Sequence, residues 1–167
     1  MTIDPASLAA REYDDTDNLV KLNLACGSVP EAGWINVDLY PGPGVDVAHD
    51  LDILPWPWDD ESVDLILAFD IFEHVEDPCD FMTECWRILK PGGLLRIHTC
   101  HIGNPVNAFR DPTHKRFLMH DSFEYWIPGT FWHDKYGYQY SKGNPKVGFE
   151  QLLKEQDPDL HLSLKRI

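Results

Sequence analysis

Two short apolar runs on either side of a small-residue turn constrain the fold of this chain more than any other stretch. Residues 21–38 read KLNLACGSVPEAGWINVD, and Leu22, Leu24 and Ala25 form an apolar run typical of a parallel strand covered on both faces. The second run ends on the carboxylate Asp38. Ligands of open α/β sheets bind beyond the carboxyl ends of the strands, so this turn and carboxylate predict a nucleoside site.

The other apolar runs extend this pattern into an α/β arrangement. We expect strands at 19–25, 34–39, 45–48, 63–69 and 94–99, with a helix that begins at Asp77-Pro78 and stops at Pro91-Gly92-Gly93. A short helix at 122–127 and two antiparallel strands at 147–154 and 160–167 follow, with a helical alternative for residues 151–154. The predicted fold class is α/β: a Rossmann-like, mostly parallel sheet with a closing antiparallel C-terminal hairpin and a reduced number of helices.

The link between the first two predicted strands is unusually short. Only residues 26–33 separate them, whereas a parallel crossover normally takes about a dozen residues or more including its helix. Either a single helical turn bridges the two strands, or the strands are not direct neighbours in the sheet.

Length and charge restrict the organisation of the chain and its partners. At 167 residues we expect a single domain at 19–167, preceded by an N-terminal arm at 1–18. The 28 acidic and 14 basic residues give a net charge of -14, which argues against binding to bulk duplex DNA. The sequence contains neither a membrane-spanning apolar run nor a secretory signal, so we expect a cytoplasmic protein that makes no membrane contact.

The cysteines predict buried free thiols rather than disulfides or a zinc site. They show no C-x-x-C spacing: Cys79 and Cys85 fall inside the predicted helix, and Cys26 and Cys100 directly follow predicted strands. The nearby histidines also match no zinc-ligand spacing: His98, His101, His114 and His120. We therefore predict no metal site.

Residues 101–140 are dense in histidine, aromatic residues and glycine. Most of the aromatic side chains must pack, either over the sheet edge as a lid on a substrate or in a homo-oligomer interface. A polar cluster interrupts the segment and is either a substrate clamp or a capped turn with a surface salt bridge; its members are Asp111, Thr113, His114 and Arg116.

Four phrases in order resemble the class I S-adenosylmethionine-dependent methyltransferases, and among these the small type-11 methyltransferase domains. They are LNLACG, GWINVDL, HDLDILPWPWDDESVDLILAFDIFEHVEDP and ECWRILKPGGLLRIHT, and they cover roughly residues 21–99. The chain departs from the family pattern at Ser28-Val29-Pro30, where the family turn has further glycines, and at Asn23, where an acidic residue is common.

The resemblance implies S-adenosylmethionine as the cofactor and assigns side chains to each part of it. These are Ala25, Cys26 and Gly27 for the methionine part, Asp38 for the ribose hydroxyls, Leu39, Asp50 and Leu51 for the adenine, and Asp70 and Ile71 for the wall beside the sulfonium.

Methyl transfer requires the nucleophile, the methyl carbon and the sulfur to be held in line, and an acceptor that carries a proton also needs a base. His74 lies where the resembled family faces its substrate, and His114 and Asp111 belong to the polar cluster, so these three are the candidate catalytic residues. The expected acceptor is a small molecule or metabolite held under residues 101–140.

Three other functions stay open. The first is a catalytically inactive cofactor-binding or structural subunit that serves a partner. The second is methylation of a nucleotide or a nucleic-acid base. A nicotinamide dehydrogenase is the third, and it lacks the expected G-x-G-x-x-G after the first strand.

Overall fold

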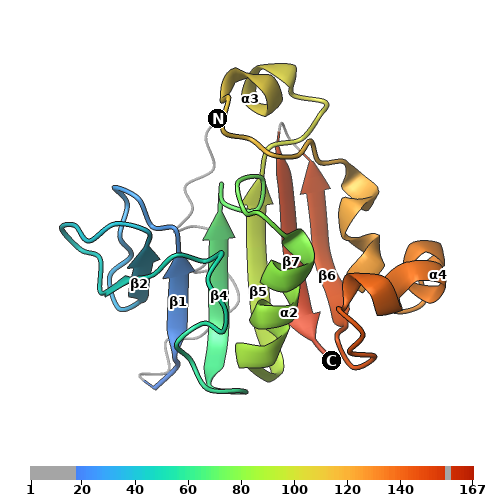
Figure 1. Cartoon of the computed structure of the whole chain (residues 1–167), viewed down its shortest axis with the longest axis horizontal. Coiled ribbons are helices and arrows are strands. Elements are labelled where there is room, and N and C mark those ends of the chain that lie inside the picture. The colour runs from blue at the N-terminus through green and yellow to red at the C-terminus, as the bar shows by residue number, and fades with distance from the viewer. Residues whose placement is uncertain (1–17, 157–158) are drawn as a thin grey trace.

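The computed structural model describes residues 18–156 and 159–167, which share one seven-stranded sheet (Figure 1). Apart from Asn18, the expected arm at 1–18 lies outside the described residues. The strands are β1 (Lys21–Leu24), β2 (Ile35–Asp38), β3 (Val47–Ala48), β4 (Val63–Phe69), β5 (Leu89–Thr99), β6 (Phe149–Gln156) and β7 (Leu160–Arg166). Their order is β3-β2-β1-β4-β5-β7-β6, in which only β7 runs antiparallel to its neighbours β5 and β6. The predicted fold class is confirmed.

The core lies between the central strands and the helix α2 (Pro78–Ile88), which lies in front of β5 in Figure 1. Leu24, Ile66 and Met82 have no exposed surface, and burial of each such side chain contributes about 1.5–3 kcal/mol. As predicted, α2 begins at the N-cap Asp77, whose carboxylate accepts hydrogen bonds from the backbone N–H of Cys79 and Asp80.

The link between β1 and β2 differs from both expected forms. The two strands are direct parallel neighbours, and residues 25–34, all of them described, contain no helix. Ala25 and Gly27 turn the chain with a φ of 54° each. The buried Asn36 side chain then holds the loop, because its Oδ1 accepts from Glu31 N–H at 2.7 Å and its amide donates to Glu31 O at 3.1 Å. Side-chain bonds therefore replace the helix that normally fills a crossover.

Strand β5 starts five residues earlier than predicted. Helix α2 ends at Ile88 and β5 begins at Leu89, so Pro91-Gly92 lies within the strand instead of before it. The pairing of β4 with β5 shifts register between Val63 and Leu65, and Gly92 has a φ of 82°. This irregularity accommodates residues that normally interrupt a strand.

Two helices in the segment after β5 were not predicted. They are α3 (Pro105–Arg110), above the carboxyl ends of the strands, and α4 (Phe131–Tyr140), beside β6 (Figure 1). The expected short helix at 122–127 is the 3-10 helix η1 (His120–Trp126), and Tyr125 stacks on Tyr140 with 3.9 Å between ring centroids. Residues 151–154 belong to β6, so their helical alternative is wrong.

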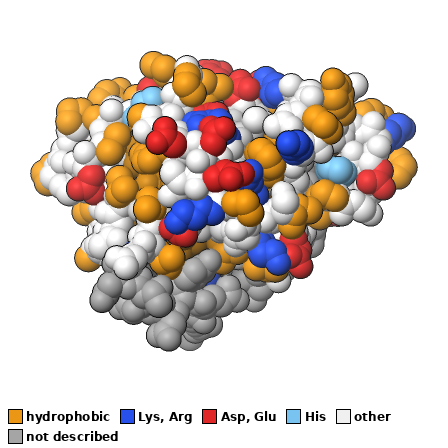
Figure 2. Space-filling view, turned by 90° about the horizontal axis from the view of Figure 1, so that it is seen from below, with side chains coloured by type: hydrophobic (Ala, Val, Ile, Leu, Met, Phe, Trp, Pro, Cys, Tyr) orange, Lys and Arg blue, Asp and Glu red, His pale blue; other side chains and the backbone are white. Residues whose placement is uncertain are grey.

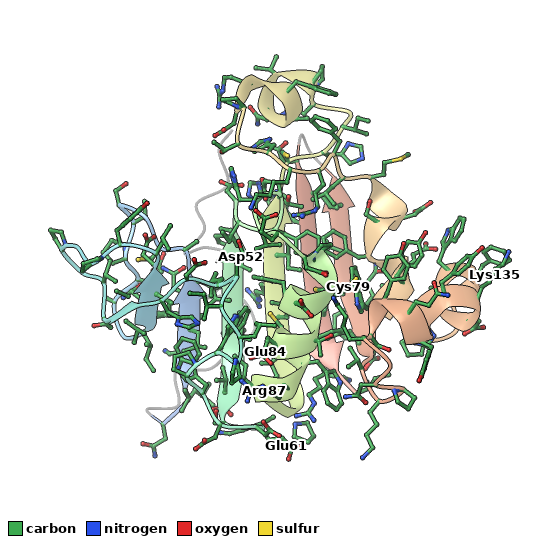
Figure 3. All side chains as sticks on the ribbon, in the orientation of Figure 1. Asp52, Glu61, Cys79, Glu84, Arg87 and Lys135 are labelled. Carbon is green, nitrogen blue, oxygen red and sulfur yellow. The ribbon has the colours of Figure 1, made fainter. Side chains whose placement is uncertain are left out.

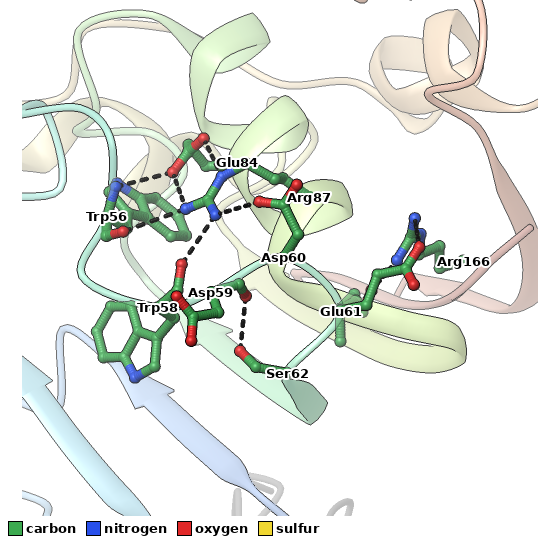
Figure 4. A network of polar contacts seen from close by, with 10 residues as sticks. Trp56, Trp58, Asp59, Asp60, Glu61, Ser62, Glu84, Arg87 and Arg166 are labelled. Atoms are coloured by element: carbon green, nitrogen blue, oxygen red, sulfur yellow. Dashed lines mark hydrogen bonds and ion pairs between the residues drawn. The ribbon is translucent and has the colours of Figure 1, made fainter.

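One arginine fastens the loop that precedes β4 to helix α2 (Figure 4). Arg87 directs all five of its N–H donors to acceptors: two reach the carboxylate of the buried Glu84, and the others reach Trp56 O, Trp58 O and Asp60. Glu84 also accepts from the backbone N–H of Trp56 at 2.8 Å. Because Trp56 Nε1 donates to Leu51 O, this loop positions the end of the segment after β3.

Three of the four cysteines are buried, Cys79 is partly buried, and all four are free thiols. Among the described residues, no helix combines the length and apolar character needed to cross a membrane. Figure 2 views the molecule from the amino ends of the parallel strands, and there the described acidic and basic side chains are interspersed without a continuous basic surface.

Candidate functional site

A cavity of about 380 Å³ lies at the carboxyl ends of β1, β2 and β4, in the size range of small-molecule sites. Six of the nine residues predicted to bind a cofactor line it: Ala25, Asp38, Leu39, Asp50, Leu51 and Ile71. Asp52, which also lines it, lies toward this edge of the sheet in Figure 3, whereas Lys135 of α4 lies at the far side of the molecule.

The turn after β1 and the end of β2 meet at this cavity. Asp38 Oδ2 accepts a hydrogen bond from Gly27 N–H at 2.8 Å, and Asp38 Oδ1 accepts one from Tyr40 N–H at 3.3 Å. A carboxylate offers about four lone-pair positions, so roughly two of them stay available to a ligand. A Cβ built on Gly27 would meet nothing within 4 Å, so the backbone of this turn is accessible.

Cys26 does not line the cavity, although the sequence grouped it with its neighbours. It is buried, and its backbone N–H donates to Val37 O at 2.9 Å, which ties the turn to β2. Burial, followed by the nearby charge of Asp38, raises the pKa of the Cys26 thiol. The thiol is therefore protonated at neutral pH and acts in packing.

The far end of the cavity presents apolar side chains beside a carboxylate. Leu39 is 49% exposed at the end of β2, so an apolar surface faces solvent there. Asp50 accepts from the backbone N–H of Asp52 through Oδ1 at 3.0 Å, while no donor from the described residues reaches its Oδ2. Leucine beside a free carboxylate oxygen suits a flat ring that carries an amino group.

A second cavity, of about 390 Å³, adjoins the first and collects the predicted catalytic residues. His74, His114 and Asp111 all line it, and so does Asp70. His74 lines both cavities and therefore stands between them.

Asp70 forms an ion pair with His98 in this second cavity. The carboxylate lies 2.6 Å from His98 Nδ1, and Asp70 itself has a φ of 51°, a strained conformation for a residue other than glycine. Burial opposes protonation of His98, but the hydrogen bond and charge of Asp70 outweigh it and raise the pKa of His98.

The polar cluster at 111–116 docks onto the segment that follows β4. Arg116 donates to the backbone carbonyls of Phe72, Val75 and Glu76, and Lys115 N–H donates to Glu73 O at 2.9 Å. The sequence left a choice between a substrate clamp and a capped turn with a surface salt bridge. Among the residues that the structure describes, Arg116 forms no such salt bridge, and its guanidinium donates to backbone carbonyls instead.

Asp111 does cap a turn, and it also reaches His74 through a threonine. Its Oδ1 accepts from Thr113 N–H at 2.8 Å and from Thr113 Oγ1–H at 2.6 Å, and these two hydrogen bonds lower the pKa of Asp111. Thr113 Oγ1 in turn lies 3.1 Å from His74 Nδ1. Two of the predicted catalytic residues are thus linked through one hydroxyl.

Asp159 is a part of the second cavity that sequence reasoning did not assign, and Glu73, in the segment between Asp70 and His74 that the resemblance places at the sulfonium, lines it as well. Glu73 is 1% exposed, and Asp159 accepts hydrogen bonds from the amides of Asn104 and Asn107 at 3.1 and 2.7 Å. Burial, together with the charge of Glu73, raises the pKa of the Cys100 thiol in the same wall to about 12. The adjacency of Glu73 to His74 is the one sequence feature that pointed to this glutamate.

Comparison with known proteins places the match on the first part of the sheet. Residues 22–97 match a family model described as a methyltransferase domain. A 58-residue stretch is 43% identical to a probable S-adenosylmethionine-dependent methyltransferase of Mycolicibacterium smegmatis, covering 34% of this chain and 22% of that protein. Another, of 49 residues, is 41% identical to a ubiquinone biosynthesis O-methyltransferase of Parvibaculum lavamentivorans, covering 29% of this chain and 19% of that protein. The matched stretches thus span about a fifth of each relative.

A solved structure extends the likeness of the fold to nearly the whole chain. It is the 1,6-didemethyltoxoflavin-N1-methyltransferase of Burkholderia thailandensis, solved with 1,6-didemethyltoxoflavin and S-adenosylhomocysteine. The TM-score is 0.57 at 13% identity, over 89% of this chain and 71% of that one.

Proposed function

Because residues 22–97 belong to the class I S-adenosylmethionine-dependent methyltransferase domain family, we propose that this protein transfers a methyl group from S-adenosylmethionine to a small-molecule acceptor. The observation that carries the proposal is that Ala25 of the turn and Asp38 line one cavity at the carboxyl edge of the sheet, while Gly27 N–H of the same turn donates to Asp38.

The residues around the first cavity fit this cofactor. Asp38 keeps about two lone-pair positions, which match the two hydroxyls of a ribose. Leu39 and Leu51 offer apolar surface to the adenine, and Asp50 Oδ2 is placed to accept from its amino group. The open backbone of the turn at 25–27 receives the methionine part.

When bound, the cofactor supplies an electrophilic methyl carbon. The protein then has to hold the acceptor in line with that carbon, exclude water and accept a proton from the acceptor. His74 stands between the two cavities, and its Nε2 is directed away from the bond that Nδ1 makes to Thr113, so this nitrogen is the proposed base. His114 and Asp111 complete the acceptor wall.

The size of the second cavity, about 390 Å³, favours an acceptor no larger than a metabolite. Two of the proteins compared above have names that accord with such an acceptor. They are the ubiquinone biosynthesis O-methyltransferase and the 1,6-didemethyltoxoflavin-N1-methyltransferase. The net charge of -14 argues against a nucleic-acid backbone as partner. A cytoplasmic location, in keeping with the four free cysteines, and a homo-oligomeric state are further parts of the proposal.

Titration calorimetry with S-adenosylhomocysteine, which carries no transferable methyl group, tests donor binding separately from turnover. We expect one site per chain, and a lack of binding would favour the structural-subunit alternative. Turnover is then measured as S-adenosylhomocysteine release over a panel of hydroxyl- and amine-bearing metabolites. Tight binding without release from any of them, or release only with nucleotide or nucleic-acid acceptors, would contradict the small-molecule proposal.

A further inference from the structure

Three metal-ligating side chains from two distant segments meet on the wall of the second cavity. Glu73 and His74 follow β4, and His114 follows α3. One ligand atom of each lies within 4.8 Å of the other two, and the two imidazole rings have centroids 4.8 Å apart. Two histidines and one carboxylate are a donor set that binds Zn²⁺ or Fe²⁺ and leaves further coordination positions open.

Hydrogen bonds place the proton of both histidines on Nδ1, so that Nε2 is the nitrogen with a free lone pair for a metal. His114 Nδ1 lies 2.9 Å from Ala108 O, and a carbonyl oxygen only accepts, so Nδ1 carries the proton and Nε2 keeps its lone pair. Thr113 Oγ1 donates its one proton to Asp111 and must therefore accept from His74 Nδ1–H. Metal-bound histidines normally make this kind of second hydrogen bond.

Glu73 is a buried carboxylate without a cationic partner among the described residues. Its Oε2 accepts from Thr99 Oγ1–H at 2.8 Å and its Oε1 from Cys100 N–H at 3.2 Å, which leaves about two lone-pair positions. Buried carboxylates are normally paired with a cation or bound to a metal. The six lysines and arginines with an ion pair to a described acid pair with acids other than Glu73: Arg87, Lys90, Lys115, Lys142, Lys165 and Arg166.

We propose that Glu73, His74 and His114 bind one divalent transition-metal ion, with Zn²⁺ as the first candidate, on the wall between the two cavities. Two imidazoles disfavour Mg²⁺ and Ca²⁺, which prefer all-oxygen ligands. Metal binding itself does not depend on methyl transfer. With a metal bound, His74 Nε2 would be a ligand and not the base. The ion would then lower the pKa of an acceptor hydroxyl at its open coordination position, and this assignment rests on the proposed function.

The test uses the full chain, stripped with chelator and titrated with Zn²⁺ by calorimetry and with Co²⁺ by absorption. His114→Asn is the sharpest variant, because the asparagine amide can keep the hydrogen bond to Ala108 O while Nε2 is lost. His133→Asn on α4 is the matched control. We expect one ion per chain in the wild type and the control, and a loss of affinity of about 100-fold or more in His114→Asn, since even an outer-shell deletion costs about 10–100-fold.

His74→Asn gives the same test if His114→Asn fails to fold by circular dichroism. The absence of stoichiometric binding, or equal affinity in both histidine variants and the wild type, would overturn the proposal. A strong sulfur-to-cobalt absorption band would also overturn it, because Cys100 would then replace Glu73 as a ligand. S-adenosylhomocysteine titration of the same metal-free samples separates this failure from failure of the methyltransferase proposal.

Discussion

Replacement of Asp38 by alanine should weaken the binding of S-adenosylhomocysteine by about 1–3 kcal/mol, which is about 5–150-fold in Kd. Two of the carboxylate's lone-pair positions are taken by Gly27 N–H and Tyr40 N–H, and about two are left for ribose hydroxyls. Each charge-assisted bond is worth about 1.5–3 kcal/mol, but water solvates the exposed carboxylate in the free protein, so the net loss is smaller than two full bonds.

Calorimetry on the wild type and three variants isolates the cause. Asp59→Ala removes the same charge from the loop before β4, outside the cavity lining, and should leave Kd unchanged. Asp38→Asn keeps one oxygen for Gly27 N–H but loses the charge, and should lie between the wild type and Asp38→Ala. Unchanged affinity in Asp38→Ala would refute the ribose assignment, and an equal loss in Asp59→Ala would assign the effect to overall charge.

Three further predictions concern stability. Arg87→Met should lower the free energy of unfolding by about 3–5 kcal/mol in urea titrations, because it leaves the buried Glu84 without its cation. Asp77→Ala removes the N-cap bonds of α2 and should cost about 0.5–2 kcal/mol by the same measurement. Because the pKa of His98 is raised in the folded protein, its pairing with Asp70 stabilises fully below the pKa of the unfolded state, near 6.5. This stabilisation is lost as the pH rises through the pKa of the folded state. Asp70→Asn should therefore remove this pH dependence from the thermal unfolding midpoint.

Matched variants check each of these predictions. Asp60→Ala removes only the exposed partner of Arg87 and should cost less than about 1 kcal/mol, so a similar cost for Arg87→Met would contradict the role of the buried pair. Asp80→Ala, like Asp77→Ala, loses a contact to Lys142, but it keeps the N-cap bonds of α2. If capping is the cause, it must lower the free energy of unfolding by less than Asp77→Ala does. A midpoint in Asp70→Asn that still depends on pH as in the wild type would exclude His98 as the titrating group.

Local patterns in the sequence determined most of the strands, the start of α2 and the residues that line the first cavity. A parallel strand buried on both faces needs a continuous apolar run, and such a run at 63–69 gave β4 with its observed bounds. Asp77-Pro78 gave the helix start because capping depends on neighbouring residues only. Gly27 and Asp38 were predicted to meet because parallel neighbours end at the same edge of the sheet, and their side of the cavity follows from that geometry.

Tertiary contacts decided what these patterns left open. Helix α4 was missed because polar and aromatic residues alternate irregularly along it, and its contact with η1 is visible only in the fold: Trp132, Tyr136 and Tyr140 meet Tyr125. The β1–β2 link needs no helix because the side chain of the buried Asn36 binds the loop. The length of the loop alone does not predict these hydrogen bonds.

The second cavity owes most to the tertiary structure. Glu73 and His114 lie 41 positions apart, and they meet because Arg116 binds carbonyls of the segment that carries Glu73. Spacing along the chain therefore gave no metal-ligand pattern, whereas the structure brings the three donor side chains together. The sequence by itself determined the sheet and the edge that carries the first cavity because those depend on residues a few positions apart. The second cavity depends on hydrogen bonds between segments that only the folded chain brings into contact.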